Sequence, residues 1–200
     1  MSTFSTVILD ADGVVNDGRL FSLEEDFGIP SERIAPFFRD AFPDCLLGKA
    51  DLREQLSGHL DTWGWKGTVD ELLGYWFRQG SMVNETVRET VRQLRRFDIP
   101  VHLATNQEKL RAEYMLKEMG YADLFTMIHP SSHIGHVKPS REFFAKVFER
   151  IPEEDPSNIL FWDDMEKNVQ AAQEFGFTAH QFTDEEDFLT KMKMYFPELR

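Results

Sequence analysis

Two pairs of acidic residues each follow a short apolar run of the sequence. Asp10 and Asp12 close "VILDAD", and Asp163 and Asp164 close "ILFWDD". Carboxylates held so close together are costly to desolvate unless a cation shares their site. Carboxylate oxygens suit Mg²⁺, which typically keeps several waters and is completed by substrate phosphate. The two pairs therefore favour a magnesium site that faces a phosphate group.

Other polar side chains suit the same chemistry. Thr105 and Asn106 end "VHLATN" and offer a hydroxyl and an amide to phosphoryl oxygens, and Lys138 in "GHVKPSREFF" offers a fixed positive charge. A carboxylate such as Asp10 can attack phosphorus and form an aspartyl-phosphate. A second carboxylate two residues on, Asp12, can protonate the leaving oxygen and then activate water. Phosphoryl transfer depends largely on such positioning and charge stabilisation.

Four short apolar runs must position these side chains, at residues 6–10, 100–106, 158–164 and, more weakly, 177–182. Their apolarity is continuous rather than alternating, which indicates strands buried on both faces, as in a parallel sheet. Amphipathic helical patterns lie between the later runs, so the chain is predicted to form an α/β fold with right-handed crossovers. Ligands bind such sheets at the carboxyl ends of the strands, and both acidic pairs and Thr105 fall there.

The stretch after the first run breaks this alternation of strand and helix. Residues 16–83 contain helical patterns without a comparable strand, including Thr68 and Glu71 in the spacing of a capping box. We therefore predict a core domain of residues 1–15 and 84–200, and an all-helical insert of residues 16–83.

The four polar motifs, in this order and spacing, resemble those of the haloacid dehalogenase (HAD) superfamily. The matching segments are "DADGVV", "LATN", "GHVKPSREFF" and "FWDDMEKNVQAAQEFG". The resemblance implies a Rossmann-like core flanked by helices, and it implies that the insert is a small helical (C1) cap. Dehalogenases of this superfamily usually lack an Asp two residues after the nucleophile, so Asp12 favours the phosphatase type.

The resemblance also implies a role for each site residue. Asp10 is the nucleophile, Asp12 the general acid and base, and Thr105 a phosphate ligand. Lys138 steadies both the nucleophile and the phosphate, and Asn106 is a further candidate for phosphate binding. Magnesium is held by Asp10 and by the second acidic pair, in which Asp164 is the ligand and Asp163 supports it. Asp12 would reach the metal through its backbone carbonyl oxygen.

The function expected from these residues is a Mg²⁺-dependent phosphatase of a small phosphate monoester, with sugar phosphates among the candidate substrates. A phosphomutase, which passes the phosphoryl group to a sugar instead of water, has the same motifs. A phospho-accepting regulatory module is a third alternative. In such receiver domains the acidic pair comes on the first strand and the phospho-acceptor on a later one, which is the opposite order. The sequence leaves open which cation reads the substrate, and the candidates are Arg19, Arg39, Lys49, Arg53 and Arg78.

Composition limits the remaining possibilities. The 200 residues are 42% hydrophobic and 28% charged, as in an ordinary globular protein. A net charge of −13 argues against nucleic acid as a partner, because binding a phosphate backbone needs clustered Lys and Arg. Cys45 is the only cysteine, which fits a reducing compartment. With no targeting segment and no apolar run near the ~20 residues of a membrane span, we expect a cytoplasmic monomer or homodimer that meets a small phosphorylated metabolite but no membrane.

Overall fold

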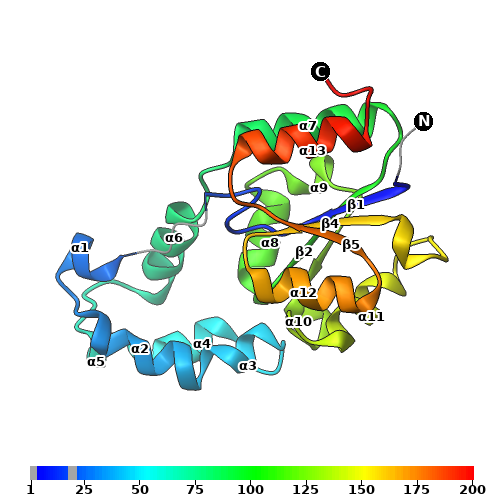
Figure 1. Cartoon of the computed structure of the whole chain (residues 1–200). Coiled ribbons are helices and arrows are strands. Elements are labelled where there is room, and N and C mark those ends of the chain that lie inside the picture. Colours follow the sequence, from blue (N-terminus) through cyan, green and yellow to red (C-terminus); the bar gives the residue numbers. More distant parts are fainter. Residues whose placement is uncertain (1–3, 18–21) are drawn as a thin grey trace.

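A parallel sheet with helices packed against it forms the larger part of the molecule (Figure 1). The computed structural model describes residues 4–17 and 22–200. The sheet has five strands in the order β3-β2-β1-β4-β5, and all neighbouring pairs are parallel. The strands are β1 (Thr6–Leu9), β2 (Val101–Thr105), β3 (Met127–Pro130), β4 (Ile159–Asp163) and β5 (Thr178–Gln181). The predicted α/β class with a parallel sheet is confirmed.

One strand was missing from the sequence prediction. β3 pairs with β2 at one edge of the sheet, and its first residue, Met127, is exposed. An edge strand of this length shows little of the continuous apolarity that marks buried strands. The sequence "MIHP" therefore gave only a weak signal of strand structure.

Helices cover both faces of the sheet because strand side chains alternate between the faces. Val7 and Leu9 of β1 share one apolar cluster with α7, α8, α9 and α13, whereas Ile8 shares another with α10, α11 and α12. The helices are α7 (Glu85–Arg96), α8 (Lys109–Lys117), α9 (Tyr121–Leu124), α10 (Ser131–Ile134), α11 (Arg141–Phe148), α12 (Glu166–Phe175) and α13 (Glu185–Tyr195), with a short 3₁₀ helix at Pro156–Asn158.

The segment between β1 and α7 is helical and stands to one side of the sheet (Figure 1). Its helices are α1 (Leu23–Phe27), α2 (Ser31–Asp40), α3 (Phe42–Leu46), α4 (Leu52–Ser57), α5 (Leu60–Trp63) and α6 (Val69–Gln79). They surround a separate apolar cluster that includes Phe37 and Trp63. The predicted capping box of Thr68 and Glu71 begins α6. The domain boundaries at residues 15/16 and 83/84 stay a prediction.

This insert contacts the core on two sides. On one side the guanidinium of Arg111 in α8 donates hydrogen bonds to the carbonyl oxygens of Phe77 and Gly80 at the end of α6. On the other side the Ser131 hydroxyl donates to the Leu46 carbonyl oxygen over 2.7 Å. The insert therefore spans the carboxyl edge of the sheet, and hydrogen bonds on both sides hold it to the core in addition to its two chain connections.

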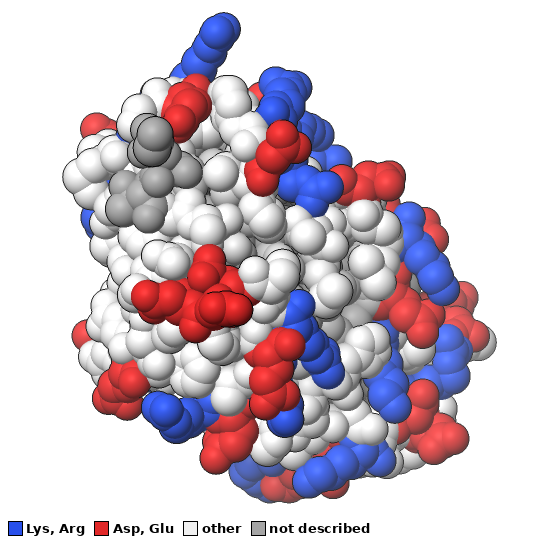
Figure 2. Space-filling model, turned by 90° about the vertical axis from the view of Figure 1, so that its right-hand side faces the viewer, with Lys and Arg blue, Asp and Glu red and all other residues white. Residues whose placement is uncertain are grey.

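The surface mixes charges of both signs. Figure 2 shows Lys and Arg side chains standing beside Asp and Glu across the face that it presents. None of the helices in the described part of the chain has the length and apolarity needed to traverse a lipid bilayer.

Candidate active site

Strand register brings the predicted site residues to one edge of the sheet. Leu9 pairs with Leu103 of β2 and with Trp162 of β4. Asp10 and Asp163 directly follow Leu9 and Trp162, and Thr105 comes two residues after Leu103, so the three residues lie together at the carboxyl ends of the three central strands. The side chains of Asp10, Thr105 and Asp163 are all buried.

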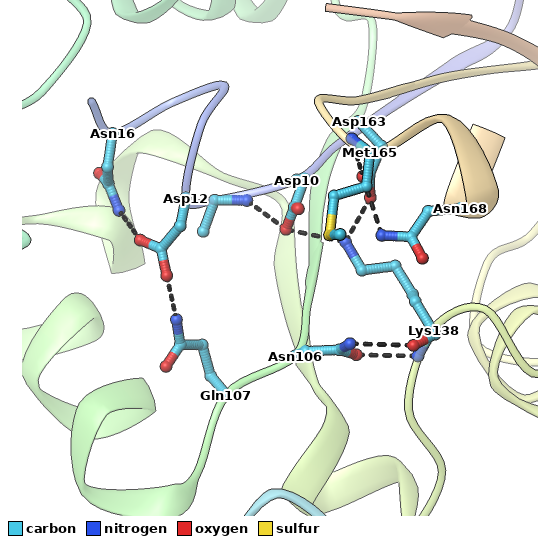
Figure 3. A network of polar contacts seen from close by, with 10 residues as sticks. Asp10, Asp12, Asn16, Asn106, Gln107, Lys138, Asp163, Met165 and Asn168 are labelled. Carbon is cyan, nitrogen blue, oxygen red and sulfur yellow. Dashed lines mark hydrogen bonds and ion pairs between the residues drawn. The ribbon is translucent and has the colours of Figure 1, made fainter. Parts of the chain in front are cut away.

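Lys138 joins two of these carboxylates. Its ammonium lies 2.8 Å from Asp10 Oδ1 and 2.6 Å from Asp163 Oδ2 (Figure 3). Lys138 is only 3% exposed and Asp163 is 0% exposed, so little water screens either contact. The backbone N–H of Ala11 also donates to Asp10 Oδ1 over 2.7 Å, which fixes the direction of that carboxylate.

The charges of this group do not balance. Two buried carboxylates share one ammonium, so a negative charge remains without a counter-charge. Burial is the main cause that raises the pKa of Asp10 to about 7; Lys138 lowers this pKa in part, and nearby Asp163 contributes to the rise. Burial lowers the pKa of Lys138, but its two carboxylate partners outweigh that effect and hold the pKa above its usual value. An additional cation at this place would be favourable.

Three carboxylates offer such a cation its ligands. Oxygen atoms of Asp10, Asp163 and Asp164 all lie within 4.8 Å of one another, which suits a hard divalent metal ion. Asp163 is oriented by the Met165 N–H and the Asn168 side-chain amide, each donating to Oδ1 over 2.9 Å. Partial burial and the neighbouring Asp163 raise the pKa of Asp164.

Gly13 leaves the space that Asp164 occupies. A Cβ atom at Gly13 would lie 2.5 Å from the Asp164 carboxylate carbon, well inside contact distance. Gly13 also has φ of +84°, a backbone conformation that favours glycine. The glycine after "DAD" therefore both turns the chain out of β1 and lets the two acidic motifs approach each other.

Asp12 lies apart from the charged group. Its carboxylate accepts hydrogen bonds from the Asn16 amide over 3.0 Å and from the Gln107 amide (Figure 3). Within the described residues, the cluster of carboxylates near Asp10 does not include that of Asp12. The backbone route from Asp12 to a metal stays a prediction. Two carboxylates separated by one residue thus face different surroundings.

Asn106 was expected to bind phosphate. In the structure its side chain bonds to the backbone of Lys138. Its side-chain Nδ2 donates to the Lys138 carbonyl oxygen over 3.0 Å, and its Oδ1 accepts from the Lys138 N–H over 2.8 Å. This double contact holds the backbone of the lysine in place. The structure thus gives Asn106 a positioning contact, and its binding to phosphate stays a prediction, as does that of Thr105.

Three residues at the site were not singled out from the sequence as site residues. Gln107 contacts the Asp12 carboxylate, Asn168 contacts Asp163, and Asn16 links Asp12 to the Tyr121 hydroxyl. Gln107 directly follows the "TN" motif, which placed it near the strand edge. Amide side chains are common in loops and on helices, so residue type alone gave no reason to select these three.

A cavity of about 660 Å³ opens between the insert and the core beside Asp12. Of the proposed substrate-reading cations, Arg39 lines this cavity, Arg53 pairs with Asp70 elsewhere in the insert, and Arg19 lies outside the described residues. The lining residues are Asp12, Ser31, Ile34, Ala35, Phe38, Arg39, Phe42, Trp76, Gly80, Asn106, Gln107, Glu108 and Arg111.

Solved structures share this fold at low sequence identity. A HAD family enzyme from Bacteroides thetaiotaomicron, in complex with magnesium and inorganic phosphate, is 21% identical with a TM-score of 0.74, covering 89% of this chain and 93% of that chain. A predicted HAD-like family hydrolase from Porphyromonas gingivalis is 16% identical with a TM-score of 0.77, covering 96% and 98%. A dehalogenase is 16% identical with a TM-score of 0.67, covering 92% and 86%.

Two comparisons of the sequence itself give different results. A comparison with curated proteins gives no match. The family of haloacid dehalogenase-like hydrolases, however, matches over residues 4–176, which include all four motifs and the helical segment between the first and second strands. The chain therefore belongs to the haloacid dehalogenase-like hydrolase family.

Proposed function

We propose that this hydrolase is a Mg²⁺-dependent phosphatase that acts on small phosphate monoesters through an aspartyl-phosphate on Asp10. The observation that carries the proposal is that the carboxylates of Asp10 and Asp12 lie in different surroundings. Asp10 lies against the buried Lys138 ammonium, and Asp12 lies at the edge of an adjacent cavity. A nucleophile with a separate proton donor suits an alkoxide leaving group, which halide chemistry does not require.

Magnesium suits the group of three carboxylates. Asp10, Asp163 and Asp164 would hold the ion, and the uncompensated negative charge around Lys138 favours it. When bound, Mg²⁺ supplies positive charge that offsets the charge of an incoming phosphate. A structural neighbour of 21% identity was crystallised with magnesium and inorganic phosphate, which is consistent with this proposal.

The chain's own residues then account for each bond. An Asp10 oxygen attacks phosphorus, the bond from phosphorus to the ester oxygen breaks, and Asp12 gives its proton to that oxygen. Asp12 next takes a proton from water as the water oxygen attacks phosphorus, the bond from phosphorus to Asp10 breaks, and inorganic phosphate leaves. Lys138 and Thr105 stabilise charge on the phosphoryl oxygens throughout.

The proposal is tested by turnover of p-nitrophenyl phosphate. The wild-type protein with Mg²⁺ should release phosphate, and chelation of the metal should abolish release. The Asp10→Asn variant should lose at least about 10³-fold in kcat, because the nucleophile is removed while the shape of the side chain is kept. Equal activity of the two proteins, or no activity with any divalent metal, would refute the assignment of Asp10.

The two alternatives predict other outcomes. Incubation with sugar phosphates distinguishes the phosphomutase, because positional isomers would then exchange without release of phosphate. A regulatory phospho-acceptor would instead accumulate a long-lived phosphoenzyme without turnover. Release of inorganic phosphate that keeps pace with substrate loss would support hydrolysis over both.

A further inference from the structure

The cavity beside Asp12 is where the leaving group of a phosphate ester would lie. In the proposed reaction the ester oxygen takes its proton from Asp12, so the remainder of the alcohol extends from that oxygen on the side of Asp12. The Asp12 side chain lines the cavity of about 660 Å³ between insert and core. This volume is within the range of about 300–1,000 Å³ that is usual for small-molecule sites.

One wall of the cavity is aromatic. Phe38 in α2, Phe42 in α3 and Trp76 in α6 line it, together with the aliphatic Ile34. Ring centroids are 5.2 Å apart for Phe38 and Phe42, and 5.5 Å apart for each of these rings and Trp76. Because the three rings contact one another, they form a single continuous surface.

The polar side chains on the core side already have protein partners. Gln107 donates to the Asp12 carboxylate, and both polar atoms of Asn106 bond to the Lys138 backbone. Glu108 accepts the N–H groups of Leu110 and Arg111 at the start of α8. These groups complete the architecture of the core, so few of their hydrogen bonds remain for a ligand.

The two cations of the lining have partners within the chain; Arg111 is buried, whereas Arg39 and its partner are exposed to solvent. The Arg111 guanidinium donates to the Phe77 and Gly80 carbonyl oxygens, which ties α8 to α6. Arg39 pairs with Asp40 through two nitrogens at 2.8 Å and 2.7 Å. A polyhydroxylated leaving group would find an apolar wall on one side and engaged polar groups on the other. Buried hydroxyls without partners weaken binding.

We propose that the substrates are phosphate monoesters whose alcohol carries an aromatic ring or a comparable apolar group, and that Phe42 is a residue that selects them. This inference rests on the proposed phosphatase function. The ring of the alcohol would pack on the surface formed by Phe38, Phe42 and Trp76, where it gains both apolar burial and aromatic contact. Sugar phosphates, the candidates from the sequence, fit this cavity less well.

The test compares two esters of primary alcohols, benzyl phosphate and glucose 6-phosphate. Both have an alkoxide leaving group on a methylene carbon, so they differ mainly in what fills the cavity. We expect kcat/KM with Mg²⁺ to be at least about tenfold higher for benzyl phosphate. Equal values, a preference for glucose 6-phosphate, or a higher value for phosphocholine, whose head group is cationic, would overturn the proposal.

Two matched variants assign the preference to the aromatic wall. Phe42→Leu removes a ring from the wall but keeps an apolar side chain, and it should reduce the ratio of the two kcat/KM values by about fivefold or more. Phe27→Leu changes a phenylalanine of the same insert that packs on Trp65 and Tyr75, outside this cavity, and should leave the ratio unchanged. An equal change of the ratio in both variants would remove the role of Phe42.

Binding separates this proposal from the catalytic one. Benzylphosphonate and methylphosphonate cannot be hydrolysed at their carbon–phosphorus bond, and calorimetry with Mg²⁺ present measures the affinity of each. We expect benzylphosphonate to bind at least about tenfold more tightly. If no ester is hydrolysed but this difference is found, the catalytic proposal fails and the cavity assignment stands. If esters are hydrolysed and the two phosphonates bind equally, the cavity assignment fails alone.

Discussion

The surroundings of Asp10 and of Asp12 differ more than their sequence separation suggests. Asp10 is buried in a charged group in which an ammonium serves two carboxylates. Asp12 is held by two amides at the edge of a cavity whose far wall consists of aromatic rings. The first place is suited to binding a metal ion, and in the proposed reaction it would also face the phosphate while the second would accommodate the alcohol. Under the proposed function, charge would determine the reaction at Asp10, and apolar contact would select the substrate beside Asp12.

Replacement of Asp12 tests whether the two carboxylates have separate roles. Asp12→Asn should lower kcat for benzyl phosphate by about 10²–10⁴-fold, because the benzyl alkoxide cannot leave without a proton. The loss should be smaller for p-nitrophenyl phosphate in single-turnover release of the alcohol, since p-nitrophenolate leaves without protonation. If the release step slows equally for the two esters, Asp12 is not the proton donor.

Replacement of Lys138 tests the charged group. Lys138→Met leaves the buried Asp10 and Asp163 carboxylates unpaired, which should reduce the free energy of unfolding by about 3–5 kcal/mol. Urea denaturation in the absence of divalent metal measures this change. Lys146→Met is the control, because Lys146 pairs with Glu149 on the surface and should contribute less than about 1 kcal/mol. If the two variants lose similar amounts of unfolding free energy, the buried ion pairs of Lys138 do not stabilise the fold more than a surface pair does.

Glu108, which lines the cavity, should make the stability of the protein depend on pH. Burial raises the pKa of Glu108 from 4.5 to about 7. The folded state therefore retains a proton that the unfolded chain has lost, and the stability from this group, full below pH 4.5, falls by about 1.4 kcal/mol per pH unit until about pH 7. Between pH 4.5 and about pH 7, the free energy of unfolding of the Glu108→Gln variant should rise by about 3 kcal/mol relative to that of the wild type. Urea denaturation at several pH values measures this difference. If the difference in the free energy of unfolding between the two proteins does not vary with pH, the raised pKa of Glu108 is contradicted.

The contact of the insert with α10 provides the smallest expected effect. A Cβ atom at Gly48 would lie 2.2 Å from the Ser132 carbonyl oxygen, whereas one at Gly28 would meet nothing within 4 Å. Both glycines have positive φ, +71° and +65°. Gly48→Ala should therefore destabilise the protein by about 1 kcal/mol more than Gly28→Ala, and it alone should raise KM by moving the edge of the insert. Indistinguishable variants would indicate that this edge is not closely packed.

The chain's local patterns were sufficient for most of the core. Continuous apolar runs predicted β1, β2 and β4, because a strand buried on both faces needs apolar side chains throughout, and a weaker run predicted the edge strand β5. The edge strand β3 was missed, since one exposed end removes that requirement. The capping residue Thr68 predicted the start of α6, because a cap bonds to backbone only three residues away.

The site was predictable only in part. Residue types and their place at strand ends indicated Asp10, Asp12, Asp163 and Asp164, and register then brought Asp10 beside Asp163. The partners of Asn106 were not evident, since its amide binds the backbone of a segment that lies far away in the sequence.

The sequence by itself determined which chemical groups stand at the ends of the central strands, and through its motifs it determined the hydrolase family. Both depend on short-range patterns, because side-chain period and motif spacing are properties of neighbouring residues. The tertiary structure alone decided that the two carboxylates face unlike surroundings, and that rings from α2, α3 and α6 form one wall. The physical reason is that a helix pattern shows which face is apolar, whereas the packing of distant segments decides what that face meets.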